Sequence, residues 1–156
     1  MEMKRSDMIR FAGQVAEENR RRGFHCSESS IRAVSQLMEI DLGDDILRIS
    51  SVFRGGGGGY GDRCGIVEAG LMLIGYLYGR TDPTVPDKAY SYLAQEWQQR
   101  FKMGFVSLYC RDILPVARKA SGAESNCART YQTGAELLME MMLDAPQLLQ
   151  DMPADA

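Results

Sequence analysis

Apolar residues recur at helical spacing along most of the chain. In the segment 7–22, Met8, Phe11 and Val15 follow one another at intervals of three or four, after Ser6 and before Gly23, which are typical start and stop residues of a helix. The same reasoning predicts further helices over 26–38, 44–53, 63–78, 87–103, 107–114 and 126–142, with Asn126 capping the last one. No strand-like alternation and no internal repeat is present. The sequence therefore predicts an all-α, single-domain bundle of about six or seven helices.

The segment 63–78 is the most apolar of these helices and is predicted to be the buried central one. Its glycines, Gly65, Gly70 and Gly75, recur every five residues and do not form one stripe, so each is expected to admit a close neighbour. We expect one helical domain over residues 1–145. The segment 146–156 contains two prolines and is predicted to be a frayed C-terminal tail.

Composition narrows the classes of function. Eighteen basic and 21 acidic residues give a net charge of −3 among 156 residues, which provides no electrostatic reason to bind nucleic acid. The longest apolar run, 69–78, is interrupted by two glycines and is about half the roughly 20 residues that cross a membrane. Residues 1–10 are not followed by a secretory apolar region, so we expect a cytoplasmic protein. In that reducing compartment, cysteines are more often metal ligands or redox thiols than crosslinks.

The four cysteines fall at related places in the predicted helices. Cys26, Cys64 and Cys127 each begin a helix, where the unpaired amides can lower a thiol pKa from about 8.5 into a range of roughly 3.5 to 7.5. An arginine follows or precedes several of them and would add positive potential: Arg63, Arg111 and Arg129. Cys110 is as well explained as a small buried packing residue. No C-x-x-C pair is present, so any shared site must be assembled by the fold.

Two features beside the cysteines are candidate parts of such a site. His25 precedes Cys26 and could act as a further ligand or as an acid–base group, although a capping or solvated role is favoured. A glycine-rich loop, 55–61, leads to Cys64 without a preceding strand or a following Gly-Lys-Ser/Thr, so nucleotide-binding motifs are not supported. It is either a surface turn or a nest of backbone amides around sulfur or a cofactor. The candidate cofactor-binding glycines are Gly57, Gly58, Gly59, Gly61 and Gly65.

These motifs, in this order, resemble the C_GCAxxG_C_C family of redox-active proteins, over roughly residues 10–142. The matching segments are His25-Cys26-Ser27-Glu28, the glycine loop with Cys64-Gly65, Ser107-Leu108-Tyr109-Cys110-Arg111 and Asn126-Cys127. The chain departs from the family after Cys64-Gly65, where Ile66 and Ala69 replace an alanine and a glycine. The resemblance implies a redox or iron–sulfur role and supplies no substrate.

Three hypotheses follow for function. In the leading one, the thiolates of Cys26, Cys64, Cys110 and Cys127 bind a metal centre, most plausibly a [2Fe–2S] cluster, for electron transfer to an unknown redox partner or for redox sensing. In the second, the same thiols carry out metal-free thiol–disulfide exchange. In the third, the chain is a helical interaction protein with buried structural cysteines. The aromatic helix around 90–101 could also pair two chains as a homodimer.

Overall fold

The computed structural model describes residues 2–121 and 127–156 of the chain. In these residues it contains seven α-helices and one short 3₁₀ helix, and no β-strand. The helices are α1 (Arg5–Arg21), α2 (Cys26–Leu37), α3 (Gly43–Ser50), α4 (Gly65–Tyr78), α5 (Lys88–Phe105), α6 (Cys110–Ser121) and α7 (Ala128–Gln150), and the 3₁₀ helix η1 is Ser51–Phe53. The predicted all-α class is confirmed.

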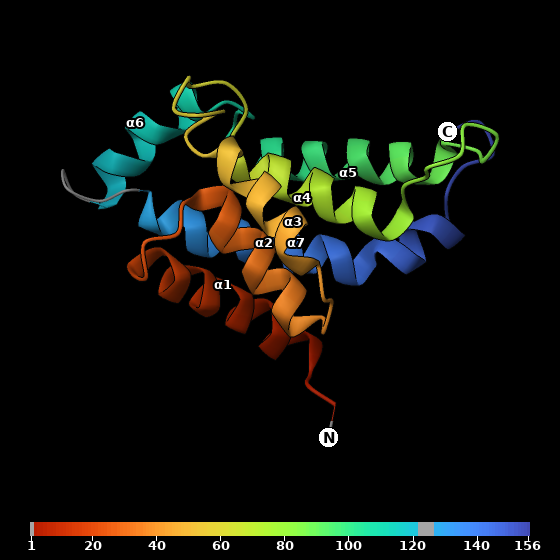
Figure 1. Ribbon diagram of the computed structural model, residues 1–156, viewed down its shortest axis with the longest axis horizontal. Coiled ribbons are helices and arrows are strands. Elements are labelled where there is room, and N and C mark those ends of the chain that lie inside the picture. Colours follow the sequence, from red (N-terminus) through yellow and green to blue (C-terminus); the bar gives the residue numbers. More distant parts are fainter. Residues whose placement is uncertain (1, 122–126) are drawn as a thin grey trace.

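The helices form a bundle whose two ends differ (Figure 1). Helix α7 packs along α1 and also contacts α2, α4, α5 and α6. The glycine-rich loop and α6 lie together at one end, whereas the C-terminus lies near the loop between α4 and α5 at the other end. No helix in the described part of the chain combines the length and the apolar character needed to cross a bilayer.

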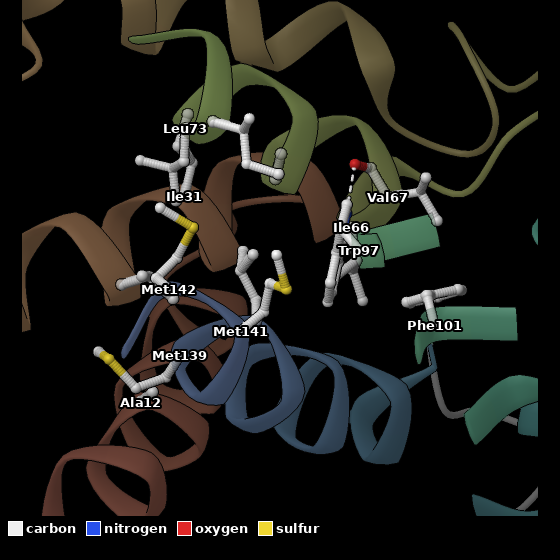
Figure 2. Packing of buried hydrophobic residues seen from close by; sticks show 14 of the residues in the cluster. Ala12, Ile31, Ile66, Val67, Leu73, Trp97, Phe101, Met139, Met141 and Met142 are labelled. Atoms are coloured by element: carbon white, nitrogen blue, oxygen red, sulfur yellow. Dashed lines mark hydrogen bonds between the residues drawn. The ribbon is translucent and has the colours of Figure 1, made fainter. Parts of the chain in front are cut away.

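A single large side chain organises the core between α4, α5 and α7 (Figure 2). Trp97 is fully buried and its Nε1–H donates a hydrogen bond to the Val67 carbonyl, at 2.9 Å. A Cβ atom on Gly70 would collide with this indole, which explains one of the three glycines of α4. Leu93 and Phe101, on the same face of α5, are fully buried as well. The aromatic face considered for pairing two chains is thus used within the chain, and the homodimer itself stays a prediction.

Helix α4 is buried at its N-terminal half and exposed near its C-terminus. Ile66 is fully buried and packs on Gly134 of α7, where a Cβ atom would come within 2.8 Å of Ile66 Cδ1. Tyr76 and Leu77, about three turns further on, are exposed. Ile66, one of the two residues that depart from the family pattern, is therefore accommodated by Gly134 on the facing helix.

Two helices extend beyond their predicted ends. The sequence predicts that Pro115 stops a helix, but α6 continues through it to Ser121 and packs against α7, although an interior proline removes a backbone donor and crowds the carbonyl four residues before it. Helix α7 likewise passes Pro146 and ends at Gln150, so it enters the segment predicted to fray; Leu148 and Leu149 pack against the core. The remaining tail is held near α5, where Lys88 Nζ donates a hydrogen bond to the Ala154 carbonyl. The predicted cap Asn126 lies outside the described residues.

Candidate functional site

All four cysteines lie at the N-termini of helices. Cys26 is the first residue of α2 and Cys110 is the first residue of α6, while Cys64 and Cys127 immediately precede α4 and α7. Cys110 begins its helix three residues later than the predicted start at Ser107, and so it shares the environment expected for the other three. Each cysteine is thereby placed beside backbone amides that have no partner within their own helix.

The fold brings the four cysteines around one cavity of about 160 Å³. Its wall also contains His25, Arg54, Gly55, Gly65, Ile66, Ile113, Leu114, Thr130 and Tyr131. A cavity of this size is smaller than the roughly 300–1,000 Å³ of sites for drug-sized ligands. It suits an inorganic centre or a small group and not a dinucleotide. A second hollow of about 510 Å³, lined by the end of α5 with parts of α6 and α7, shares Ile113 and Thr130 with it.

Backbone hydrogen bonds pair the segment before α4 with the segment before α6. The amide of Cys64 donates to the Leu108 carbonyl at 2.8 Å, and the amide of Cys110 donates to the Asp62 carbonyl at 2.7 Å. Between these bonds, Arg63 and Tyr109 form an antiparallel bridge. Two cysteines that are 46 residues apart in sequence are therefore held on neighbouring backbone segments.

The glycine loop shapes this pairing by folding on itself. Six of its glycines have positive φ: Gly55, Gly56, Gly57, Gly58, Gly59 and Gly61. The Gly61 amide donates to the Gly55 carbonyl at 2.9 Å, and the Asp62 amide donates to the Gly56 carbonyl at 3.0 Å. At Gly56 a Cβ atom would collide with the backbone of Asp62. The loop is thus a compact turn that only glycine can form at this density of positive φ.

The candidate glycines divide into two groups. Gly57, Gly58 and Gly59 are exposed and are not among the described residues that line the cavity. Gly61 acts through its carbonyl, which accepts a hydrogen bond from the Arg111 amide at 3.0 Å. Gly65 does line the cavity, as does Gly55, which the sequence reasoning did not select. Both readings of the loop therefore apply: its tip is a surface turn and its base faces the sulfur atoms.

The sulfur of Cys26 lies in a nest of backbone amides. A Cβ atom on Gly65 would be only 2.5 Å from Cys26 Sγ, so the absence of a side chain after Cys64 makes room for this sulfur. The amides of Gly55, Ser27 and Gly65 act on the Cys26 thiol in the direction that favours its thiolate. The base of the glycine loop and the start of α4 together surround one sulfur atom.

Burial nevertheless keeps these thiols neutral. Desolvation raises the pKa of Cys26. It also raises the pKa of Cys64, which is 6% exposed, and the nearby charge of Cys26 acts in the same direction. The amides of Ile66 and Val67 lower the pKa of Cys64 without reversing this effect. The expected low-pKa thiolates are therefore wrong for Cys26 and Cys64, because the loss of water outweighs the helix N-terminus.

The neighbouring arginines are directed to other partners. Arg63 pairs with Glu68 at 2.7 Å, and Arg111 lies 3.8 Å from Asp62. Arg129 is exposed and lines the second hollow. None of the three is among the largest influences on the pKa values of Cys26 and Cys64. The positive potential expected from sequence neighbours does not dominate at these two sulfur atoms, since adjacency in sequence does not fix the direction of a long side chain.

His25 is exposed at the edge of the cavity and precedes α2 as its N-cap residue. Its backbone amide donates a hydrogen bond to the Glu28 carboxylate at 2.9 Å. This is half of a capping box, in which the third helical residue reaches back to the residue before the helix. His25 thus occupies the N-cap position of α2, and its role as a ligand or acid–base group stays a prediction.

Tyr131 is the principal residue of this cavity that sequence reasoning missed. It is 5% exposed, lines the cavity and lies four residues after Cys127 in α7. Residues four apart share one face of a helix, so this spacing was the available sign. Within residues 2–121 and 127–156, no three His, Cys, Asp or Glu side chains are placed close enough to hold a metal ion.

The fold and the cavity define a class of protein: a small helical bundle that gathers four cysteines from four helix N-termini. The chain belongs to the family described as "Putative redox-active protein (C_GCAxxG_C_C)", whose model matches residues 24–141. The match includes every cysteine and the glycine loop. Comparison with curated proteins and with solved structures gives no match.

Proposed function

We propose that the chain binds a [2Fe–2S] cluster through Cys26, Cys64, Cys110 and Cys127 and uses it to transfer electrons or to sense redox state. The observation that carries this proposal is the convergence of the four cysteines on one cavity of about 160 Å³. Four cysteine thiolates are the usual ligands of this cluster, which supplies one-electron chemistry when bound. Such ligation uses two thiolates on each iron, so it does not require three donors around one ion.

The chemistry of the donor set fits such a centre. Amides of Gly55, Ser27 and Gly65 act on the Cys26 sulfur, and amides of Ile66 and Val67 act on Cys64. N–H donors to sulfur stabilise thiolate charge and tune the reduction potential of an iron–sulfur site. Burial opposes the thiolate only while no cation is present, because a bound metal deprotonates its thiol ligands outright. The same burial protects the sulfur atoms from water and oxidants.

The test is anaerobic purification followed by reconstitution with ferrous iron and sulfide. We expect visible absorption and two irons and two sulfides per chain, together with loss of colour in each Cys→Ser variant. The variant Tyr60→Phe, on the exposed tip of the glycine loop, is the control and keeps the wild-type cluster content. A protein that stays colourless and free of iron after reconstitution would overturn the proposal.

A second candidate is supported by the closeness of Cys26 and Cys64. Both carry free thiols, Cys26 Sγ lies against the glycine that follows Cys64, and the charge of Cys26 opposes ionisation of Cys64. In thiol–disulfide exchange, two protein thiols would reduce a small disulfide to two thiols and form one intramolecular disulfide, which conserves protons and electrons. Glutathione disulfide is a suitable probe.

The two candidates give separate results. Exchange predicts loss of two thiols with glutathione disulfide and a Cys26–Cys64 crosslink by mass spectrometry, in protein that has never bound iron. Cys110→Ser should leave this crosslink intact but abolish the cluster. If the variant with all four cysteines changed to Ser keeps its fold and every measurable property, the cysteines are structural packing residues and both candidates fail.

A further inference from the structure

Tyr131 places a phenol at the cavity of the four cysteines from α7, the helix that Cys127 precedes. It lies one turn after Cys127 in α7, and the Tyr131 amide donates to the Cys127 carbonyl at 3.0 Å. The residue is 5% exposed and lines the cavity that all four cysteines line. A buried tyrosine hydroxyl normally has a hydrogen-bond partner, and the four cysteines share this cavity with Tyr131.

The charges around the phenol keep its proton in place. Burial raises the pKa of Tyr131, and the charges of Cys26, Cys127 and Cys64 raise it further, while Arg20 acts against them. Arg20 comes from α1 and is fixed by two hydrogen bonds to the Glu17 carboxylate, at 2.9 and 2.8 Å. The hydroxyl is therefore retained as a donor at the cavity, whose wall includes residues of α2 and α7.

We infer that Tyr131 is a positioning residue that donates its O–H hydrogen bond to a cysteine sulfur of the cavity and so stabilises negative charge there. The candidate acceptors are Cys127, one turn earlier at the start of the same helix, and Cys26 at the start of α2, because both line this cavity together with Tyr131. This inference rests on the proposed function, because the sulfur atoms must carry negative charge, either as ligands or as attacking thiolates. A donor to sulfur raises the reduction potential of a cluster by favouring the more negative, reduced form.

The experiment compares Tyr131→Phe with Tyr78→Phe, a partly buried tyrosine at the far end of α4. In reconstituted protein, we expect Tyr131→Phe to keep the iron and sulfide content but to shift the reduction potential to a more negative value. Tyr78→Phe should keep the wild-type potential. An unchanged potential in Tyr131→Phe, or an equal shift in both variants, would overturn the inference.

If the protein binds no cluster, the role of Tyr131 can still be tested through the reactivity of the cysteine thiols. If wild-type protein binds no iron, the native metal-free chain is alkylated with iodoacetamide at one pH, and the modified cysteines are identified by mass spectrometry. Tyr131→Phe should slow alkylation of Cys26 or Cys127 several-fold, since a lost donor makes the thiolate rarer. Equal rates in wild type and variant contradict the inference. Urea unfolding checks that Tyr131→Phe is still folded, both for the measurement of potential and for the measurement of alkylation.

Discussion

The two ends of the bundle are built by different means. In the centre and at the C-terminal end, helices pack through large apolar side chains around Trp97, which is fully buried and hydrogen-bonded to Val67. At the thiol end, defined here as residues 54–65, 106–121 and 127–131, backbone hydrogen bonds and glycines with positive φ determine the arrangement. Figure 1 shows this contrast between straight paired helices and a coiled loop beside α6.

This difference teaches where stability and function reside. Apolar burial stabilises the fold in proportion to the area removed from water. The core supplies most of this burial, and Cys64 is the one cysteine among its buried residues in the described part of the chain. The thiol end adds a cavity, whose lining lacks packing partners on one side, and a run of glycines, whose ordering costs more chain entropy than that of other residues. Changes in the core should therefore alter unfolding without altering the thiols, and changes at the thiol end should alter sulfur chemistry whether or not they also alter unfolding.

The largest effect is expected in the core. Trp97→Ala removes the indole that fills the space above Gly70 and leaves the Val67 carbonyl without its donor, so the free energy of unfolding should fall by about 3–5 kcal/mol. Tyr60→Ala, in the glycine loop, removes a ring that is 86% exposed and should change it by less than about 0.5 kcal/mol. Urea unfolding followed by circular dichroism measures both. Similar losses in the two variants would contradict the contrast between the ends.

The next effect separates two glycines of the loop. Gly56→Ala imposes positive φ on alanine and a collision with the Asp62 backbone, at a combined cost of about 3 kcal/mol. Gly58→Ala has positive φ but no atom within 4 Å, so it should cost about 1–2 kcal/mol. The Asp62 carbonyl accepts the Cys110 amide, and this bond helps to pair the segment before α6 with the segment that contains Cys64. Gly56→Ala should loosen this pairing and so also expose Cys64 to alkylation. Equal labelling of Cys64 in the two variants would show that the loop does not position it.

The sequence predicts the core end well because its information is local. Helical spacing of apolar residues locates α1, α4 and α5 within a few residues, and the buried stripe with Trp97 follows from the same spacing. The extension of α6 through Pro115 depends on packing against α7, which no local pattern contains. Helix ends are set by such contacts as much as by propensity.

At the thiol end, the sequence predicts placement but not environment. Helix-start positions of Cys26, Cys64 and Cys127 follow from local signals, and the glycine loop is evident. The convergence on one cavity, the part played by Tyr131 and the raised thiol pKa values depend on which segments meet and on how much water they exclude. Burial is a property of the whole fold, so a rule for exposed helix N-termini gave the wrong direction for these thiols.

The raised thiol pKa values predict a pH dependence of stability. In the reduced, metal-free chain, unfolded thiols ionise near pH 8.5, while burial keeps Cys26 and Cys64 protonated in the folded chain to higher pH. Above about pH 8.5 the folded state thus binds more protons than the unfolded state. Each such thiol then lowers the free energy of unfolding by about 1.4 kcal/mol per pH unit until its folded pKa is reached.

Urea titrations between pH 7 and 10.5 measure this slope. Cys64→Ser should flatten it by about one thiol's share, whereas Met103→Ser, an exposed change at the end of α5, should leave it as in wild type. A pH-independent stability across this range would show that the thiols ionise equally in both states. Bound metal should also remove the dependence, because the ligands are then already deprotonated.

The smallest effect compares two glycines of one helix. Gly75 is exposed in α4 with no atom within 4 Å of an added Cβ, so Gly75→Ala should stabilise the protein by about 0.5–1 kcal/mol through helix propensity. Gly65→Ala would place its Cβ 2.5 Å from Cys26 Sγ. It should give no such gain and should instead displace the sulfur, which reduces cluster content or the yield of the Cys26–Cys64 disulfide. If Gly65→Ala is as stabilising as Gly75→Ala and leaves both readouts intact, the missing side chain is not what admits the sulfur.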